Sequence, residues 1–137
     1  MAERVLVTGV TGYIGQHCGA ELLRQGYEVY GTIRSMEKAE AVREGIAKVA
    51  PIDNLTFVAA DLMSDLNWQD VMSGCKYVLH VASPFIIANP DDESEMISPA
   101  VDGTLRVLKA AKAANVERVV VTSSLIAIIA GKSSGHY

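Results

Sequence analysis

Three glycines at a constant spacing are the residues that most directly suggest a chemistry. Residues 5–15 read VLVTGVTGYIG, so Gly9, Gly12 and Gly15 follow an apolar run at intervals of three. Between a first strand and a first helix, such glycines allow a tight turn, the approach of a ligand to the backbone, and close packing of helix on strand. The N–H groups and the partial positive charge at the start of that helix bind anions. The stretch predicts a pyrophosphate site, and glycines that only shape the turn are the alternative.

A cation stands where many dinucleotide-binding strands are followed by an acid. An Asp or Glu at the end of the second strand accepts from the ribose 2′-hydroxyl of NAD. Here residues 29–33 are followed by Arg34, and Lys38 is a second cation nearby. Arginine makes charge-assisted hydrogen bonds to phosphate, so we expect the 2′-phosphate of NADP here, with NAD less favoured. The alternatives are a solvated surface charge for Arg34 and a ribose contact from Glu37.

Polar or small residues follow the third and fourth predicted strands, at the edge of the sheet where ligands bind. Asp61 and Leu62 follow residues 55–59, and a carboxylate there can accept from the adenine amino group. Capping of the following loop by Asp61 is the alternative. The fourth strand ends in the sequence HVASP, whose small residues would let a dinucleotide lie across the sheet. We interpret His80, inside that strand, as a core histidine rather than a catalytic base.

The elements that must position these residues alternate along the chain. Runs of Val, Ile and Leu predict strands at residues 4–8, 29–33, 55–59, 77–82 and 119–122. Helices are predicted at residues 13–25, closed by Gly26 in the C′ position, at residues 35–50 with Ser35 as N-cap, and at residues 68–72. A long helix begins at Ser98, or nearer Ser94. Apolar strands that are each followed by a helix predict a doubly wound α/β fold of Rossmann type, with a parallel sheet in the order 3-2-1-4-5.

The long helix carries apolar residues at helical spacing, which we expect to face the core. They are Ile97, Val101, Leu105, Leu108 and Ala111. The acidic residues 88–96 before it, ANPDDESEM, are expected to be a solvated helix start whose acids complement the dipole. A substrate contact is the alternative for this segment.

Composition limits the classes of function. The 137 residues make one domain, half of them apolar and a fifth charged. A net charge of −4 argues against nucleic acid as a partner. No apolar stretch reaches the roughly 18 residues of a membrane span, and the N-terminus runs into a strand without a signal peptide, so a cytoplasmic location is expected. Cys18 and Cys75 fit no metal site and no disulfide framework, and we expect small buried side chains.

Five motifs in sequence order resemble the extended short-chain dehydrogenase/reductase superfamily, most closely its dihydroflavonol 4-reductase and cinnamoyl-CoA reductase group. They are VTGVTGYIG, GTIRS, AADL, HVASPF and VVVTSS. The resemblance implies that residues 1–137 are an incomplete NAD(P)-binding domain of an enzyme that reduces a ketone or aldehyde to an alcohol with NADPH. Ser124 would be the catalytic residue that hydrogen-bonds the substrate carbonyl. The cofactor-binding residues implied are Gly9, Gly12, Tyr13, Ile14, Gly15, Arg34, Asp61, Leu62, Val81, Ala82, Ser83 and Ser123.

Two departures from the superfamily pattern bear on function. Ala100 stands where many extended relatives have Asn before the pair Gly103 and Thr104, which weakens the link to sugar-nucleotide epimerases. The general acid of the superfamily, the Tyr of YxxxK, has no counterpart: Tyr137 is the one tyrosine after Ser124, and no Lys follows it. We therefore expect the 137-residue chain alone to be inactive, without the later strands and the substrate lobe. The alternatives are a non-catalytic, redox-sensing NADP-binding module and an NAD-dependent sugar-nucleotide epimerase or dehydratase.

The apolar run LIAIIA, residues 125–130, has no later helix in this chain to cover it. Because exposed apolar patches drive association, we expect the chain to self-associate. The expected partner in the reaction is a small-molecule carbonyl compound, and the sequence leaves flavonoid, phenylpropanoid, steroid and small aldehyde or ketone substrates open.

Overall fold

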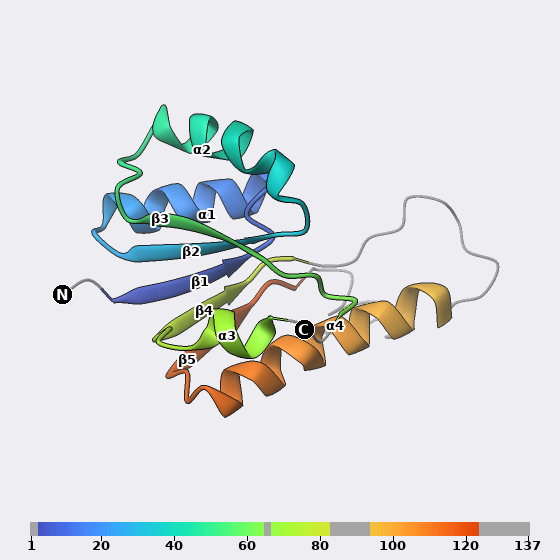
Figure 1. Ribbon diagram of the computed structural model, residues 1–137. Helices are drawn as coiled ribbons and strands as arrows, with labels where there is room; N and C mark the ends of the chain where they lie inside the picture. The colour runs from blue at the N-terminus through green and yellow to red at the C-terminus, as the bar shows by residue number, and fades with distance from the viewer. Residues whose placement is uncertain (1–2, 65–66, 83–93, 124–137) are drawn as a thin grey trace, which may run out of the picture.

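A parallel sheet of five strands forms the centre of the computed structural model (Figure 1). The structure describes residues 3–64, 67–82 and 94–123, with the backbone alone at residues 94–100. The strands are β1 (Arg4–Thr8), β2 (Glu28–Ile33), β3 (Leu55–Ala59), β4 (Tyr77–His80) and β5 (Arg118–Val121). Their order is β3-β2-β1-β4-β5 and all neighbours are parallel, which confirms the predicted doubly wound topology.

Helices cover both faces of the sheet, as Figure 1 shows. One face carries α1 (Tyr13–Arg24) and α2 (Ala39–Ala47), and the other carries α3 (Trp68–Met72) and α4 (Ser94–Ala113). α1 ends as predicted, with Gly26 in the C′ position at φ +91°. The N–H of Gly26 donates to the carbonyl oxygen of Leu23 (3.1 Å), and that of Tyr27 to the carbonyl oxygen of Leu22 (3.0 Å). Both bonds satisfy carbonyls that a helix end otherwise leaves unpaired.

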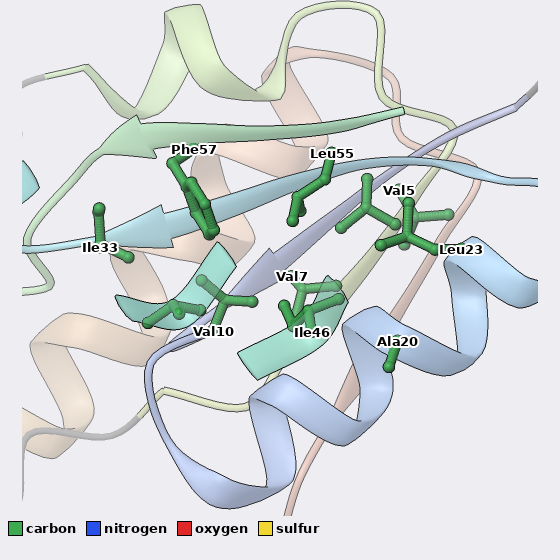
Figure 2. Close-up of a cluster of buried hydrophobic side chains, with 11 residues drawn as sticks. Val5, Val7, Val10, Ala20, Leu23, Ile33, Ile46, Leu55 and Phe57 are labelled. Carbon is green, nitrogen blue, oxygen red and sulfur yellow. The ribbon is translucent and has the colours of Figure 1, made fainter. Parts of the chain in front are cut away.

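Two apolar clusters hold the helices to the sheet. On the face of α1 and α2, alternate strand residues point toward the helices (Figure 2), and the cluster includes Val5, Val7, Leu55, Phe57, Ala20, Leu23 and Ile46. On the opposite face, the cluster includes Leu6, Val78, Trp68, Met72, Val107 and Ala111. Because successive residues of β1 are buried on opposite faces, the strand reads as a continuous apolar run.

The segment after β2 differs from the single helix predicted at residues 35–50. A short 3₁₀ helix, η1 (Met36–Lys38), comes first, and α2 follows it and ends at Ala47. Ser35 precedes η1 with an extended backbone, and its side chain makes no capping hydrogen bond, so the prediction that it caps a long α-helix is wrong. A 3₁₀ turn often opens an α-helix, and the apolar pattern alone does not separate the two.

β4 ends at His80 rather than at residue 82. The amides of Val81 and Ala82 donate to the hydroxyl oxygen of Thr8, at 2.9 and 3.0 Å, instead of continuing the strand. β5 begins and ends one residue earlier than predicted, and α4 begins at Ser94, the earlier of the two starts that the sequence left open.

α4 packs on the sheet through a different face from the one predicted. Val101, Leu105 and Leu108, named here the apolar stripe of α4, are 49%, 44% and 37% exposed, so their prediction as core residues is wrong. Ala111 of the predicted face is buried, and the side chain of Ile97 lies outside the described residues. The residues that are buried are small: Gly103, Val107, Ala110 and Ala111. Small side chains let the helix approach its neighbours closely, so close packing decides the orientation of α4.

Both cysteines are free thiols. Cys75 is buried as predicted, and burial raises the pKa of its thiol to about 11. Cys18 is only half-buried. Within the described part of the chain, no helix is both long enough and apolar enough to cross a membrane.

Candidate functional site

A cleft of about 1150 Å³ opens at the carboxyl edge of the sheet, where ligands bind in open α/β folds. Four segments line it: the glycine loop after β1, the segment after β2, the loop after β3, and the residues after β4. These segments are far apart in the sequence, and the parallel sheet brings their ends together. The predicted residues that line the cleft are Gly9, Gly12, Tyr13, Ile14, Gly15, Arg34, Lys38, Asp61, Leu62, Val81 and Ala82.

The glycine loop after β1 leaves no room for side chains at two of its three glycines. Gly9 has φ +69°, and a Cβ there would lie 2.9 Å from the Cα of Ala82. A Cβ on Gly15 would lie 2.1 Å from the carbonyl oxygen of Gly9. At Gly12 the same oxygen would be 3.6 Å away, and the space beyond belongs to the cleft. The geometry agrees with a turn role for Gly9 and a packing role for Gly15, and a Cβ on Gly12 would enter the space in which a ligand would lie.

The first turn of α1 presents backbone amides rather than side chains. Gly12 is its N-cap and has no side chain to accept from these amides, and the first turn contains no acidic residue. The N–H of Gly12 donates to the carbonyl oxygen of Gly9 (3.1 Å), and the N–H of Gly9 donates to Oγ1 of Thr32 (3.1 Å), so the loop itself is held in place. Amides at a helix start have no acceptor within the helix, and together with the helix dipole they favour an anion.

A buried polar cluster adjoins the cleft between the ends of β1 and β4. The hydroxyl oxygen of Thr8 accepts from the amides of Val81 (2.9 Å) and Ala82 (3.0 Å), and it lies 2.8 Å from Nδ1 of His80. Thr8 is fully buried and His80 is 3% exposed, which confirms His80 as a core histidine. Burial lowers the pKa of His80 below its ordinary value of 6.5, so the imidazole is neutral at pH 7.

Two cations lie along the β2 side of the cleft. Arg34 directly follows β2, Lys38 ends η1, and both are exposed. Within the ranges that the structure describes, neither side chain makes an ion pair or a hydrogen bond, so both are available to an anionic ligand. Glu37 is exposed in the first turn of η1, where an acid complements the helix dipole, and it is not among the lining residues, so the geometry does not support a ribose contact.

Asp61 and Trp68 shape the β3 side of the cleft. Oδ1 of Asp61 accepts from the N–H of Met63 (2.9 Å), which is the loop-capping role that the sequence left as an alternative. The indole N–H of Trp68 donates to the carbonyl oxygens of Asp61 and Ser64, both at 3.0 Å. Because a carboxylate has several acceptor positions on two oxygens, this cap leaves Asp61 able to accept from a ligand as well. The two roles are therefore compatible.

α4 holds the next residue of this loop, Leu62. The side chain of Leu62 is 8% exposed and lies against Gly103, where an added Cβ would be 3.2 Å from the Cβ of Leu62. The guanidinium of Arg106, one turn further along α4, donates to the carbonyl oxygen of Leu62. The small-residue face of α4 thus sets the position of a loop that lines the cleft.

Several predicted residues lie outside the described residues. They are Ser83, Ser124, Tyr137 and the segments 88–93 and 125–130. Ser123 is described, but it is exposed and does not belong to the lining of the cleft. The catalytic role of Ser124 and the nicotinamide-side roles of Ser83 and Ser123 stay predictions.

The lining also contains residues that the sequence patterns did not assign to a ligand site. They are Thr11, Thr32, Ile33, Ser35, Ala60, Met63 and Trp68. Thr32 had a usable signal, because a hydroxyl near the end of a buried strand needs a hydrogen-bond partner. Trp68 had none, since its place beside the cleft depends on the path of the loop after β3.

Comparisons with known proteins find similar proteins along most of this chain. The model of the NAD dependent epimerase/dehydratase family matches residues 5–135. The chain is 43% identical over 129 residues to an uncharacterised oxidoreductase of Schizosaccharomyces pombe, covering 90% of this chain and 37% of that protein. It is 37% identical over 122 residues to a dihydroflavonol 4-reductase of Dianthus caryophyllus, with 89% and 34% covered.

The chain is also similar in structure to a solved reductase. The yeast methylglyoxal/isovaleraldehyde reductase complexed with NADPH superimposes with a TM-score of 0.76 at 36% identity, over 88% of this chain and 37% of the reductase. The chain therefore spans 34–37% of the length of these three proteins.

Proposed function

The chain belongs to the NAD-dependent epimerase/dehydratase family, and on that premise we propose that it is the cofactor-binding part of a reductase that uses NADPH to convert a ketone or aldehyde to an alcohol. The observation that carries this proposal is the cleft in which a glycine loop, the amide end of α1 and two exposed cations meet. The names of the relatives support it, because they include a dihydroflavonol 4-reductase and a reductase complexed with NADPH.

The pyrophosphate of the cofactor would lie at the start of α1. The amides of Tyr13, Ile14 and Gly15 form the first turn there, and the space beside Gly12 admits a ligand close to the backbone. Gly9 and Gly15 would contribute by shape, since side chains at these positions would collide with backbone. These groups suit two linked phosphates, which carry negative charge and only accept hydrogen bonds.

The adenosine end would lie between β2 and β3. Arg34 would bind the 2′-phosphate, with Lys38 as a second cation. Among the described residues that line the cleft, Asp61 is the one acid, and it follows β3 rather than β2, where an acid would favour the 2′-hydroxyl of NAD. Asp61 would accept from the adenine amino group while its other contact caps the loop, and Leu62 would give the apolar wall. Arg34 is also the feature that disfavours an NAD-dependent epimerase or dehydratase.

The nicotinamide end would pass along Val81, Ala82 and Ser83, with Ser123 on its far side. The bound cofactor supplies a hydride to the substrate carbonyl. Ser124 would donate a hydrogen bond to the carbonyl oxygen and stabilise the charge that develops there. A general acid must then protonate the alkoxide, and the YxxxK pair that would do so has no counterpart in these residues. We therefore expect the chain to bind cofactor without reducing a substrate by itself.

Cofactor binding can be tested with the one tryptophan of the chain, because Trp68 lines the cleft. Titration with NADPH should quench the fluorescence of Trp68 to a saturating level, because the excited indole transfers energy to the reduced nicotinamide. A weaker response is expected with NADH. No saturable change with either cofactor, in a chain shown to be folded by circular dichroism, would contradict the proposal.

The reductase activity needs a longer polypeptide that continues past Tyr137 into a YxxxK pair. Such a protein should oxidise NADPH in the presence of a carbonyl compound, and Ser124→Ala should lower kcat by about 10²–10³-fold, the usual cost of one such donor. NADPH binding without turnover of any carbonyl substrate would favour the non-catalytic module instead. The cytoplasmic location and the self-association of the chain also stay predictions.

A further inference from the structure

We propose that Thr8 and His80 are positioning residues of the cofactor cleft. A neutral His80 orients the hydroxyl of Thr8, and this hydroxyl fixes the amides of Val81 and Ala82 in the wall of the cleft. The hydrogen bonds of this cluster do not depend on what the chain binds. Their effect on cofactor binding rests on the proposed function. Neither residue lines the cleft, so both would act through the backbone that follows β4.

The hydrogen bonds of Thr8 determine the direction of each contact. A hydroxyl has one proton to donate and two lone pairs that accept. Backbone amides only donate, so Val81 and Ala82 occupy both lone pairs. The remaining proton is directed to Nδ1 of His80, 2.8 Å away, which must be the acceptor. His80 is therefore the neutral tautomer with its proton on Nε2, and the tautomer and the orientation of the hydroxyl are set together.

Protonation of His80 would break this arrangement. Nδ1 would become a donor, and three N–H groups would then converge on one oxygen that has two lone pairs. Thr8 is fully buried, so water cannot take the place of a lost partner. The amides at risk belong to Val81 and Ala82, which line the cleft. Ala82 also bounds the glycine loop, since it lies 2.9 Å from the position of a Cβ on Gly9.

No charged group in the described part of the chain offsets this cost. Thr8 of β1 and Val121 of β5 lie opposite His80 on its two sides. Thr122, which follows β5, donates to the carbonyl oxygen of His80 from its amide (3.1 Å) and its hydroxyl (3.3 Å). α3 and α4 cover this side of the sheet, and the charged side chains they carry in the described part are Asp70, Asp102, Arg106, Lys109 and Lys112. None of them shifts the pKa of His80, which burial alone lowers.

Three variants separate the components of the cluster. His80→Asn places an amide oxygen near the position of Nδ1 and cannot be protonated in this pH range, so the acceptor is kept without its titration. Thr8→Ser keeps the hydroxyl. Thr8→Val keeps the shape and removes the hydroxyl, which leaves the amides of Val81 and Ala82 without their acceptor. Should Thr8→Val fail to fold, the comparison of wild type with His80→Asn and Thr8→Ser is sufficient.

The first measurement needs no cofactor. Nitrogen NMR of the His80 imidazole at about pH 7.5 should show Nδ1 without a proton and Nε2 with one. Hydrogen exchange of the Val81 and Ala82 amides, from about pH 7.5 to about pH 5.5, should lose about tenfold of its protection in wild type relative to His80→Asn as the imidazole titrates. Thr8→Ser should behave like wild type. A proton on Nδ1 at neutral pH, or equal protection in wild type and His80→Asn at every pH, would overturn the proposal.

The second measurement tests the link to the cofactor. Over the same pH range, the Kd for NADP⁺ should rise more in wild type than in His80→Asn, by about the factor seen in amide protection. The variant is a matched control, because the 2′-phosphate of the cofactor titrates equally in both proteins. An identical pH profile would overturn the link. If the NMR result is as expected and neither protein binds NADP⁺, the proposed function fails and the positioning effect on the cofactor fails with it, while the Thr8–His80 contact itself stands.

Discussion

Replacing Arg34 by alanine should weaken the binding of NADP⁺ and leave the binding of NAD⁺ nearly unchanged, because the two cofactors differ only in the 2′-phosphate. Arg34 is exposed beside the cleft and has no partner among the described residues, so its removal breaks no internal contact. A hydrogen bond between a guanidinium and a phosphate contributes about 1.5–3 kcal/mol. Solvent and salt screen an exposed pair, so we expect about 1.5–2 kcal/mol, or about a ten- to thirtyfold higher Kd.

Lys38 offers a matched control, since it is an exposed cation that lines the same cleft. A lysine binds as a flexible point charge, so Lys38→Ala should raise the Kd for NADP⁺ only about two- to fivefold. Arg34→Asp should go further than alanine and invert the preference, because a carboxylate repels the phosphate and can accept from the 2′-hydroxyl of NAD⁺.

Quenching of Trp68 by NADPH and NADH, measured at low and high salt, would give both dissociation constants. The increase in the Kd for NADPH caused by Arg34→Ala should become smaller as the salt concentration rises. At each salt concentration, the substitution should leave the Kd for NADH unchanged. Equal losses for the two cofactors would refute the assignment of Arg34 to the 2′-phosphate. A loss that salt does not change would refute the electrostatic reason for it.

Five further outcomes are expected. Gly15→Ala should destabilise the fold by about 3 kcal/mol because its Cβ meets backbone, whereas Gly12→Ala should cost about 1 kcal/mol in urea unfolding and abolish quenching by NADPH. Gly103→Ala should change the free energy of unfolding by less than about 1 kcal/mol, since helix propensity offsets the contact, while the displaced Leu62 raises the Kd for NADPH severalfold. Because burial lowers the pKa of His80, the unfolded chain binds the proton first, and the free energy of unfolding should fall as the pH drops below 6.5, with a smaller fall in His80→Asn. The chain should elute as an oligomer in size-exclusion chromatography with light scattering, because the run LIAIIA and the exposed apolar stripe of α4 both offer apolar surface. A monomeric chain would contradict this.

The topology was predictable from the sequence because it depends on patterns that are local. Strands buried on both faces read as unbroken apolar runs, and Gly9 at the end of the first run marks the turn into α1. The face of α4 was not predictable in this way. Spacing favours Leu105 and Leu108, but the helix buries Gly103 and Val107, because its distance from the sheet and from the loop after β3 is set by close packing. The spacing of apolar residues shows that a helix is amphipathic. Which side of α4 is buried depends on the size of the side chains that must fit between the helix and its neighbours.

The candidate site shows the same limit at the level of single contacts. Most of the residues that line the cleft were predicted from the sequence, but the side chains that support them come from other elements and bind backbone atoms of the motifs. Thr32 binds the amide of Gly9, Trp68 the carbonyl of Asp61, and Arg106 the carbonyl of Leu62.

Contacts of this kind leave little trace in a local pattern, because any residue supplies the backbone partner. They also divide the cleft into two parts. The residues proposed for the pyrophosphate and adenosine ends of the cofactor are supported by contacts within the described residues, so we expect this chain to bind cofactor without the rest of a reductase. The proposed nicotinamide end would depend on Ser83, Ser123 and Ser124 and on a general acid from elsewhere, so we expect this chain to bind cofactor without reducing a substrate.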